Sequence, residues 1–358
     1  MSSGDLKLAK ELEGALMVSK LPIPEPFSGG LLLSYKCTNE CKHCMYACSS
    51  KWKNDWISEK DAEGILNQLS SKFQGKYPSK SDTIGINYGV HFTGGEPFLN
   101  FDLLLKVTRM AHELQIPSTF VETNSFWCVD DETTREKLVQ LKDAGLHGIL
   151  VSVNPFILEQ TPFERTERAI EISEETFDRN VIVYQPFFHH QFKRLSIRNT
   201  LPFEEYLQKI DLSGLHENIE LLPMGRAPYK LGYLYLKYPA KAFFGQSCRK
   251  ELTRPWHVHI DNYGNYIAGY CGGISLGDAR DLDSICSGVD LEERPILDAL
   301  VTDLERLYEF GVKEFGYEER KEGYVSKCHL CADVRRHIAQ RTSELKELRP
   351  REFYYHFE

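Results

Sequence analysis

The stretch CTNECKHCMYAC, residues 37–48, decides how the rest of the chain is interpreted. It contains three cysteines with the spacing C-x3-C-x2-C, which are Cys37, Cys41 and Cys44. The residues before it, LLLSYK at 31–36, form an apolar run that is typical of a buried strand. The three thiols are therefore expected on the loop that follows this strand, close enough together to share one metal centre.

Two kinds of metal centre fit this loop. A structural zinc site normally has four protein ligands, and Cys48 or His43 would complete such a set. An iron–sulfur cubane is also held by cysteine thiolates, and three cysteines on its four irons leave one iron without a protein ligand. The loop alone leaves both interpretations open.

The composition narrows the classes of function. The net charge is −9 and the lysines and arginines are spread along the chain, which disfavours a nucleic-acid partner. No stretch is long and apolar enough to cross a bilayer, and the start MSSGDLKLAKELEGALMVSK lacks the features of a secretory signal, so we expect a cytoplasmic protein without membrane contact. Ten cysteines in a reducing compartment indicate metal binding or catalysis rather than disulfides.

Strand and helix patterns alternate over the first two thirds of the chain. Ser58, for example, can cap a helix in which Ile65, Leu69 and Phe73 share one apolar face. Repeated strand and amphipathic helix predict an α/β fold of parallel β/α units, with the active site beyond the C-terminal ends of the strands. About six units fit, fewer than the eight of a closed barrel. Helices are predicted at 58–73, 101–115, 131–144, 164–177 and 203–210, and further strands at 118–123, 148–154, 180–186 and 218–223.

A different pattern begins after residue 227. Residues 256–271, WHVHIDNYGNYIAGYC, alternate, turn at DNYGN and alternate again, which is typical of a hairpin. A second, smaller domain is therefore predicted in the C-terminal third. The predicted organisation is an N-terminal extension (1–29), a core (30–239), a second domain (240–348) and a C-terminal tail (349–358).

A glycine turn, TGGEP at Thr93–Pro97, ends the second predicted strand. Together with the cysteine trio it resembles the signature of the radical S-adenosylmethionine (radical SAM) enzymes, in which SAM chelates the open iron of a [4Fe-4S] cluster. In that family SAM is cleaved to a 5′-deoxyadenosyl radical, which takes a hydrogen atom from the substrate. Paired glycines let the backbone approach a ligand closely. The resemblance implies a cluster on Cys37, Cys41 and Cys44, and SAM contacts from Gly94, Gly95, Glu96 and Pro97.

Further positions match the family more loosely. Glu122 and Asn124 end the third strand and Ser152 lies in the fourth, where the family places groups that bind SAM, although polar residues at strand ends are common. Tyr46 could line the adenine pocket or pack in the core. Cys128 follows the third strand at the expected active-site face and is a candidate catalytic residue, as a hydrogen-atom donor or substrate contact, with a buried apolar role as the alternative.

A second set of cysteines lies in the predicted C-terminal domain. It resembles the Twitch domain, the shorter form of the SPASM domain, in which four cysteines ligate an auxiliary [4Fe-4S] cluster. Two of these four cysteines flank the hairpin, one on each side, and a helix start or turn is expected to present the C-x2-C pair. Six residues separate Gly264 from the next cysteine where the family usually has four, and zinc is the alternative occupant. The implied ligands are Cys248, Cys271, Cys328 and Cys331.

The resemblance implies a partial (β/α)6 TIM-like barrel of the radical SAM type with a smaller Twitch-like α+β domain. The first expected function is an oxidoreductase whose auxiliary cluster accepts an electron from a substrate radical, with a flavodoxin or ferredoxin as low-potential donor. The second is a peptide-modifying maturase that forms crosslinks or epimerises residues. The third is a zinc-stabilised binding protein without enzymatic activity. The sequence does not say whether the substrate is a small molecule or a peptide.

Overall fold

The structure is a computed structural model, and it describes residues 20–77, 83–210, 219 and 221–358. A seven-stranded sheet lies at its centre, with the strand order β6-β5-β4-β3-β2-β7-β8. Neighbouring strands from β6 to β7 run parallel, and β8 runs antiparallel to β7. The strands are β2 (Ser28–Leu32), β3 (Gly89–Thr93), β4 (Thr119–Thr123), β5 (Gly148–Ser152), β6 (Val181–Tyr184), β7 (Val258–Ile260) and β8 (Tyr266–Ile267).

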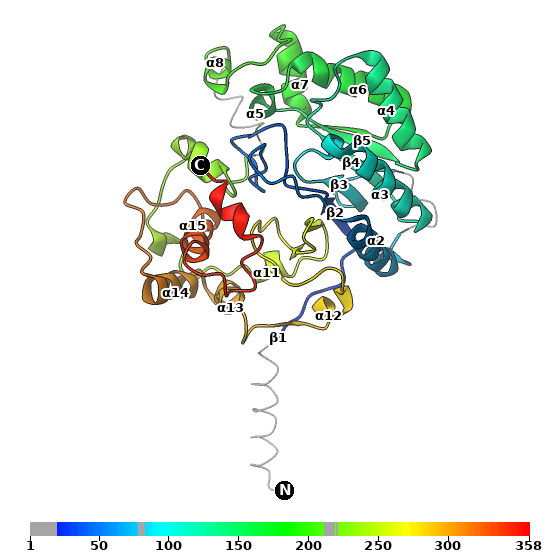
Figure 1. Cartoon of the computed structure of the whole chain (residues 1–358). Coiled ribbons are helices and arrows are strands. Elements are labelled where there is room, and N and C mark those ends of the chain that lie inside the picture. The colour runs from blue at the N-terminus through cyan, green and yellow to red at the C-terminus, as the bar shows by residue number, and fades with distance from the viewer. Residues whose placement is uncertain (1–19, 78–82, 211–218, 220) are drawn as a thin grey trace.

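Four long helices connect the parallel strands and cover one face of the sheet (Figure 1). Three of them begin at a side-chain cap: the Ser58 hydroxyl accepts a hydrogen bond from the backbone N–H of Asp61, and Asn100 and Asp130 cap the next two in the same way. Their apolar stripes are buried, as the helical spacing predicts. These helices are α2 (Glu59–Phe73), α3 (Phe101–Glu113), α4 (Asp131–Asp143) and α6 (Phe163–Phe177).

The first strand of the sheet begins earlier than predicted. The expected strand 31–36 is wrong in its bounds, because β2 spans Ser28–Leu32 and the residues after it already belong to the cysteine loop. Gly29 and Gly30 have low strand propensity. They are tolerated because neighbouring strands crowd both positions: a Cβ on Gly30 would lie 2.3 Å from His91 Nε2. Tertiary packing, which the local pattern does not contain, therefore places this strand.

The parallel α/β core is confirmed, whereas the six-unit barrel is not. In the described part of the chain, β2 to β6 are the parallel strands that precede residue 227. The predicted sixth strand, 218–223, lies partly outside the described residues, and residues 219 and 221–223 are not in a strand. The sheet gains its further parallel strand from the C-terminal third instead, because β7 pairs with β2.

The predicted hairpin at 256–271 is confirmed, with His259 opposite Ile267 across the pair. Its strand β7 belongs to the same sheet as the core, so the chain is continuous across the predicted boundary at residue 240. The segment expected as a C-terminal tail, 349–358, contains a 3-10 helix with Phe353 and Tyr354 buried. The helices of this third are α13 (Pro295–Thr302), α14 (Leu304–Phe315), α15 (Lys327–Ala339) and η4 (Arg351–Tyr355).

Shorter elements complete the described part of the chain. Two short strands, β1 (Lys20–Leu21) and β9 (Val289–Asp290), pair antiparallel at the base of the view in Figure 1. The remaining helices are η1 (Pro97–Asn100), α5 (Pro155–Leu158), α7 (Pro186–Arg194), α8 (Phe203–Leu207), α10 (Ala227–Lys230), η2 (Gly232–Leu234), η3 (Ala240–Phe243), α11 (Arg249–Leu252) and α12 (Leu282–Cys286).

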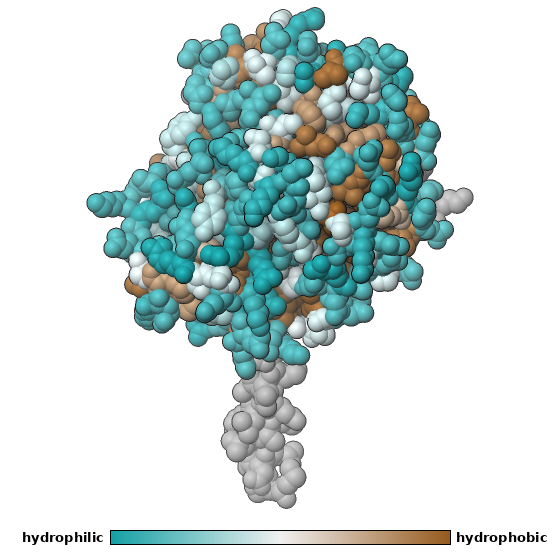
Figure 2. All heavy atoms as spheres, viewed as in Figure 1, coloured by the Kyte–Doolittle hydropathy of each residue, from teal (hydrophilic) through white to brown (hydrophobic). Residues whose placement is uncertain are grey.

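The face of the molecule shown in Figure 2 is mostly hydrophilic, with smaller apolar areas between the polar side chains. Among the described residues, none of the helices combines the length and the apolar composition of a membrane span.

Candidate functional site

A cavity of about 290 Å³ lies at the C-terminal ends of the parallel strands, where the β/α pattern places an active site. The cysteine loop forms one side of it, and the ends of β3, β4 and β5 form another. The predicted site residues that line the cavity are Cys37, Cys41, Cys44, Tyr46, Gly94, Gly95, Glu122, Asn124 and Ser152.

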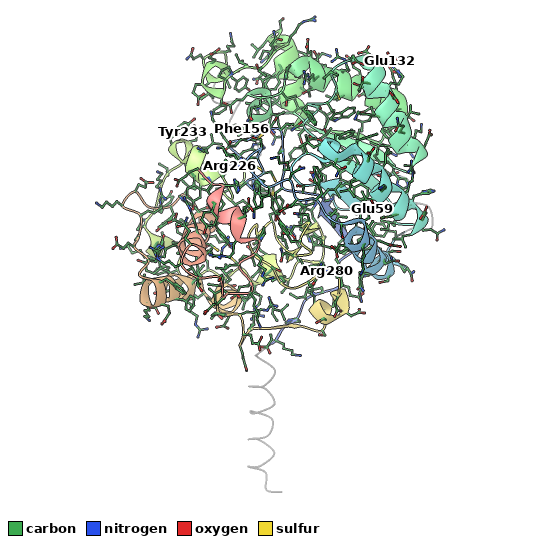
Figure 3. All side chains as sticks on the ribbon, viewed as in Figure 1. Glu59, Glu132, Phe156, Arg226, Tyr233 and Arg280 are labelled. Carbon is green, nitrogen blue, oxygen red and sulfur yellow. The ribbon has the colours of Figure 1, made fainter. Side chains whose placement is uncertain are left out.

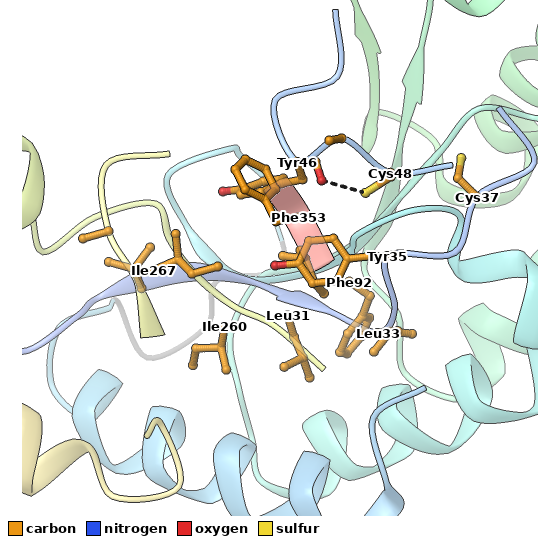
Figure 4. Close-up of a cluster of buried hydrophobic side chains, with 14 of the residues drawn as sticks. Leu31, Leu33, Tyr35, Cys37, Tyr46, Cys48, Phe92, Ile260, Ile267 and Phe353 are labelled. Atoms are coloured by element: carbon orange, nitrogen blue, oxygen red, sulfur yellow. Dashed lines mark hydrogen bonds between the residues drawn. The ribbon is translucent and has the colours of Figure 1, made fainter. Parts of the chain in front are cut away.

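The cysteine trio is folded into one end of this cavity. Cys37 and Cys41 are buried and Cys44 is half-buried, and Figure 4 shows the loop that carries them above the apolar side chains of the sheet. Burial raises the pKa of Cys37 to about 12 and that of Cys41 well above its usual range. A metal centre must displace these protons, because the thiolate is the ligand form. Three thiols that line one end of a single cavity are a donor set that suits an iron–sulfur cluster.

Cys48 lies beside Cys44 and also lines the cavity. The Cys48 thiol donates to the Tyr46 oxygen, and its position beside the Cys44 sulfur lowers the pKa of Cys44. Four thiols are thus available at this end of the cavity, but in the described part of the chain no three of them bring their sulfur atoms within 4.8 Å of one another, as one zinc ion requires. Metal analysis separates the two interpretations.

Arg226 holds the cysteine loop in place through hydrogen bonds to its backbone, and it was not among the predicted site residues. Its side chain is fully buried, and its guanidinium donates to the backbone oxygens of Cys41 (2.8 Å), Ala47 (2.8 Å) and Cys48 (3.1 Å). A fourth bond, from Nε to the oxygen of His356 at 3.0 Å, ties the loop to the C-terminus. In Figure 3 Arg226 lies between the cysteine loop and the C-terminal helices. Arg226 therefore sets the shape of the loop.

The paired glycines of the TGGEP turn serve a different purpose from the one expected. A Cβ on Gly95 would lie 1.9 Å from the oxygen of Lys36, and one on Gly94 would lie 2.3 Å from the oxygen of Ser34. Gly95 also donates its backbone N–H to Ser34 at 2.8 Å. The glycines thus let the turn pack against the backbone that leads into the cysteine loop. They line the cavity as well, so contact with a ligand there is sterically open.

Glu96 and Pro97 do not line the cavity, and their expected contacts with SAM are not provided by this arrangement. The Glu96 carboxylate accepts hydrogen bonds from the backbone N–H of Asn124 (2.8 Å), from the Thr123 hydroxyl (3.0 Å) and from the backbone N–H of Phe98 (3.2 Å). Pro97 begins η1, where its missing N–H costs nothing. The physical reason is that Glu96 is used to join the glycine turn to the end of β4.

Replacing Glu96 with Gln should flatten the pH dependence of stability. Burial raises the pKa of Glu96 from 4.5 to about 7, so between these values the folded chain holds a proton that the unfolded chain has lost. Stability contributed by this group therefore falls as pH rises from about 4.5 to about 7, by on the order of 3 kcal/mol. Urea unfolding of SAM-free protein from pH 5 to 8 measures the slope.

The exposed Glu132 supplies the control for this measurement, because Glu132→Gln should leave the slope as it is in the wild type. Identical slopes for Glu96→Gln and the wild type would show that the Glu96 carboxyl is not perturbed.

The remaining predicted polar residues do reach the cavity. Asn124 Nδ2 donates to Cys37 Sγ at 3.6 Å and to the Thr38 hydroxyl at 3.0 Å, so it lies against the cysteine trio. Glu122 accepts from the Thr93 hydroxyl at 2.6 Å, and burial raises its pKa. Ser152 ends β5 at the opposite wall.

Two buried polar atoms in the cavity wall indicate a polar ligand. Within the described residues, the Tyr46 hydroxyl and His43 Nδ1 have no hydrogen-bond partner. A buried polar group without a partner costs about 1–3 kcal/mol. A ligand with hydrogen-bonding groups, as SAM has, would supply the missing partners, so the cavity fits the cofactor that the resemblance implies.

Cys128 does not reach the cavity, contrary to its expected place at the active-site face. Its side chain is fully buried and it is not part of the cavity wall. It packs near Thr134 beneath α4, and burial raises the pKa of its thiol far above the usual range. The geometry gives this thiol the apolar packing role that was the alternative. Cys286, at the end of α12, lies apart from both cavities.

A second, smaller cavity of about 40 Å³ is lined by all four cysteines of the C-terminal set. α15 presents the C-x2-C pair at its first turn, where the Ser326 hydroxyl caps the helix, as the helix-start expectation had it. The two additional residues before Cys271 are absorbed in a turn in which Gly269 and Tyr270 have positive φ. The thiols that converge there are Cys248, Cys271, Cys328 and Cys331.

Arg335 accompanies this cysteine set, and its i, i+4 spacing from Cys331 on a helix was the signal that could have found it. Its Nε donates to Cys331 Sγ at 3.2 Å, and its Nη1 donates to the oxygen of Gly272 at 3.0 Å. A buried guanidinium offsets the negative charge that several thiolates bring together. The four thiols suit an iron–sulfur cluster. Among the described residues no three of them bring their sulfur atoms within 4.8 Å of one another, so they are not the close set that a single zinc ion binds.

The two cavities adjoin one another. Tyr270 lines both cavities. Met224 and Gly225 line the smaller cavity, and the next residue, Arg226, holds the cysteine loop of the larger one. Tyr270 was not among the predicted site residues, because an aromatic residue in a hairpin matches no cofactor-binding or catalytic motif. His257 and His259, which also line the large cavity, were missed for the same reason.

Comparisons with known proteins agree with an iron–sulfur site on the cysteine loop. The model of a 4Fe-4S single cluster domain matches residues 30–162, which include the cysteine trio and the glycine turn. No curated protein sequence matches the chain. The chain therefore resembles the radical SAM superfamily in its cysteine motif and its glycine turn, and the family match supports an iron–sulfur cluster on this part of the chain.

Several solved structures are similar to the chain at low identity. The structure of native anSMEcpe with bound AdoMet is 13% identical to this chain, with a TM-score of 0.42. The matched region covers 93% of this chain and 96% of anSMEcpe. BtrN in complex with AdoMet and 2-DOIA is 14% identical, with a TM-score of 0.38, and the match covers 78% of this chain and 88% of BtrN. SuiB from Streptococcus suis is 17% identical, with a TM-score of 0.36, and the match covers 81% of this chain and 68% of SuiB. At these values the solved structures assign no activity to this chain.

Proposed function

We propose that this chain is a radical SAM enzyme that oxidises its substrate. A [4Fe-4S] cluster would be held by Cys37, Cys41 and Cys44 on a partial barrel, and an auxiliary cluster by the four cysteines of a Twitch-like domain. The observation that carries the proposal is the large cavity, where the cysteine trio and the Gly94–Gly95 turn, fifty residues apart in sequence, face the same space.

The chain's own residues have separable roles in this proposal. When bound, a cluster with one open iron supplies the electron that cleaves SAM to a 5′-deoxyadenosyl radical, which removes a hydrogen atom from the substrate. Three thiolates leave that iron free, and Arg226 and Asn124 hold the thiolate loop. Polar groups at the ends of β4 and β5, Glu122 and Ser152, line the space for SAM and substrate.

The position of the second cysteine set favours oxidation over other radical reactions. Removal of a hydrogen atom and one further electron from an alcohol or side chain is a net two-electron oxidation, and it needs an electron acceptor near the substrate. Tyr270 lines both cavities, so the proposed auxiliary cluster borders the space in which the substrate radical would form. A flavodoxin or ferredoxin would supply the electron that starts the cycle.

Formation of 5′-deoxyadenosine tests this proposal. The full chain, purified without oxygen, is incubated with SAM and dithionite, and the products are separated by chromatography. We expect 5′-deoxyadenosine and methionine to form with the wild type and to be absent without reductant. A chain that carries iron and still forms no 5′-deoxyadenosine would contradict the proposed function.

The double variant Cys328→Ser with Cys331→Ser should separate the two cysteine sets. We expect about four irons fewer per chain, because two of the four ligands of the smaller cavity are lost. Reductive cleavage of SAM should continue, since the cysteine trio is intact, whereas oxidation of the substrate should stop. Iron analysis and 5′-deoxyadenosine formation measure these outcomes. Unchanged iron in the folded variant would show that these thiols bind no cluster.

A further inference from the structure

Three buried histidines form a cluster at the edge of the large cavity, and neither the cysteine motifs nor the proposed reaction uses them. His91 lies on β3, His259 lies on β7, and His257 directly precedes β7. The ring centroids are 5.0–5.3 Å apart in all three pairs, and all three side chains are buried. We propose that these three imidazoles bind a divalent transition-metal cation, with zinc as the preferred ion.

The sheet is arranged so that the imidazoles can approach one another. Gly30 of β2 is paired with His91 on one side and with His259 on the other. A Cβ at Gly30 would lie 2.3 Å from His91 Nε2 and 2.6 Å from His259 Cδ2. A side chain in the central strand would therefore separate the two rings. With glycine there, they meet over the strand.

The distances suit a shared ion better than a direct hydrogen bond. His91 Nε2 lies 3.4 Å from His259 Nε2, which is long for a hydrogen bond between nitrogen atoms. Two nitrogens that bind one tetrahedral zinc at about 2.0–2.1 Å lie about 3.3–3.4 Å apart. One ligand atom from each of the three residues falls within 4.8 Å of the others, so a small ring rotation completes the set.

The protonation of His257 is fixed in the form that binds metals. Its Nδ1 lies 2.9 Å from the backbone oxygen of Ile86, which can only accept, so Nδ1 carries the proton and Nε2 keeps its lone pair. A histidine that donates one ring nitrogen to a carbonyl is the usual arrangement of a metal ligand. His257 also has positive φ, an uncommon backbone conformation for a residue other than glycine.

The surroundings balance the charge of a cation. Glu122 Oε1 lies 3.5 Å from His91 Nε2, and the other carboxylate oxygen is held by the Thr93 hydroxyl. Arg254 lies nearby and opposes a cation, but its guanidinium stacks on Trp256 and Tyr270.

The site would be open toward the substrate. His257 and His259 line the large cavity, while His91 lies behind them. Three protein ligands leave one position of a tetrahedral zinc free, as in catalytic zinc sites. An oxygen donor of the substrate, such as an alcohol or carboxylate, could occupy that position within the cavity that holds the cysteine trio. The inference does not depend on the proposed radical chemistry.

Zinc content and zinc X-ray absorption of the full, iron-loaded chain test the inference. The chain is equilibrated with Zn²⁺, freed of loosely bound ion, and analysed. We expect about one zinc per chain, with nitrogen or oxygen ligands at about 2.0–2.1 Å. No retained zinc, or a shell of sulfur ligands at about 2.3 Å alone, would overturn it. This readout needs no variant, and iron content and SAM cleavage report on the proposed function separately.

Variants locate the ion. His91→Asn and His259→Gln should each lower zinc occupancy at least tenfold at equal free zinc, and Gly30→Ala should do so while all three ligands remain. The controls are His190→Gln, which alters an exposed histidine, and Gly64→Ala, where a Cβ meets nothing within 4 Å. Zinc that survives all three cluster variants would place the ion elsewhere and overturn the inference.

Discussion

Replacing Cys37, Cys41 and Cys44 together with alanine is expected to abolish 5′-deoxyadenosine formation and to remove about four irons per chain. The three thiols are the side chains of the large cavity that would hold the first cluster, and the C-terminal set lies in a separate cavity that the substitutions do not touch. The remaining iron should therefore stay. Iron and sulfide analysis with chromatography of the SAM products measures both effects.

Cys286→Ala is the matched control for this experiment, because Cys286 is a half-buried thiol outside both cavities. It should retain the iron and the SAM cleavage of the wild type. A triple variant that keeps all its iron would show that the trio is not a cluster site.

Arg226→Met is expected to lower the free energy of unfolding by about 3–5 kcal/mol and to empty the first cluster site. The substitution removes the donor to the oxygens of Cys48 and His356, whereas the oxygens of Cys41 and Ala47 still accept from the Cys44 backbone and from Trp52. Each lost hydrogen bond to a charged group costs about 1.5–3 kcal/mol. Because whole domains are stable by only about 5–15 kcal/mol, this is a large fraction. Urea unfolding and iron content measure the effect.

Two further variants make the interpretation of Arg226 specific. Arg226→Lys keeps the charge but not the planar set of donors, so it should lie between the wild type and the Met variant. Arg135→Met removes an exposed guanidinium that pairs with Glu175 and should cost less than about 1 kcal/mol. Full iron content and an unchanged unfolding midpoint in Arg226→Met would show that the loop does not depend on this residue.

Local patterns predicted most elements of the core because they carry their own signals. The helix that follows Ser58 begins and ends within a residue of its predicted bounds, since a cap and an apolar stripe define it. The first strand was misplaced because Gly29 and Gly30 have no strand propensity of their own. Only the neighbouring strands explain glycine at these positions: a Cβ would meet Val258 at Gly29, and the imidazoles of His91 and His259 at Gly30.

The candidate site was predictable where sequence spacing itself implies shared ligands. The C-x3-C-x2-C and C-x2-C spacings predicted the cysteines that converge, and the ends of the strands predicted Asn124 and Ser152. Glu96 was not separable in this way, because a carboxylate beside a glycine turn can equally face a ligand or the next strand. Two hydrogen bonds, from Asn124 and Thr123, direct it to the end of β4. Arg226 and the histidine cluster depend on contacts between distant segments, which no local pattern contains.

The iron content of the full chain, purified without oxygen, tests the central claim most directly. Two cysteine sets that each hold a [4Fe-4S] cluster predict about eight irons and a similar amount of sulfide per chain, in brown protein. Colourless protein with zinc bound to the thiols and no iron would contradict the account, because neither cavity would then hold a cluster that can pass an electron.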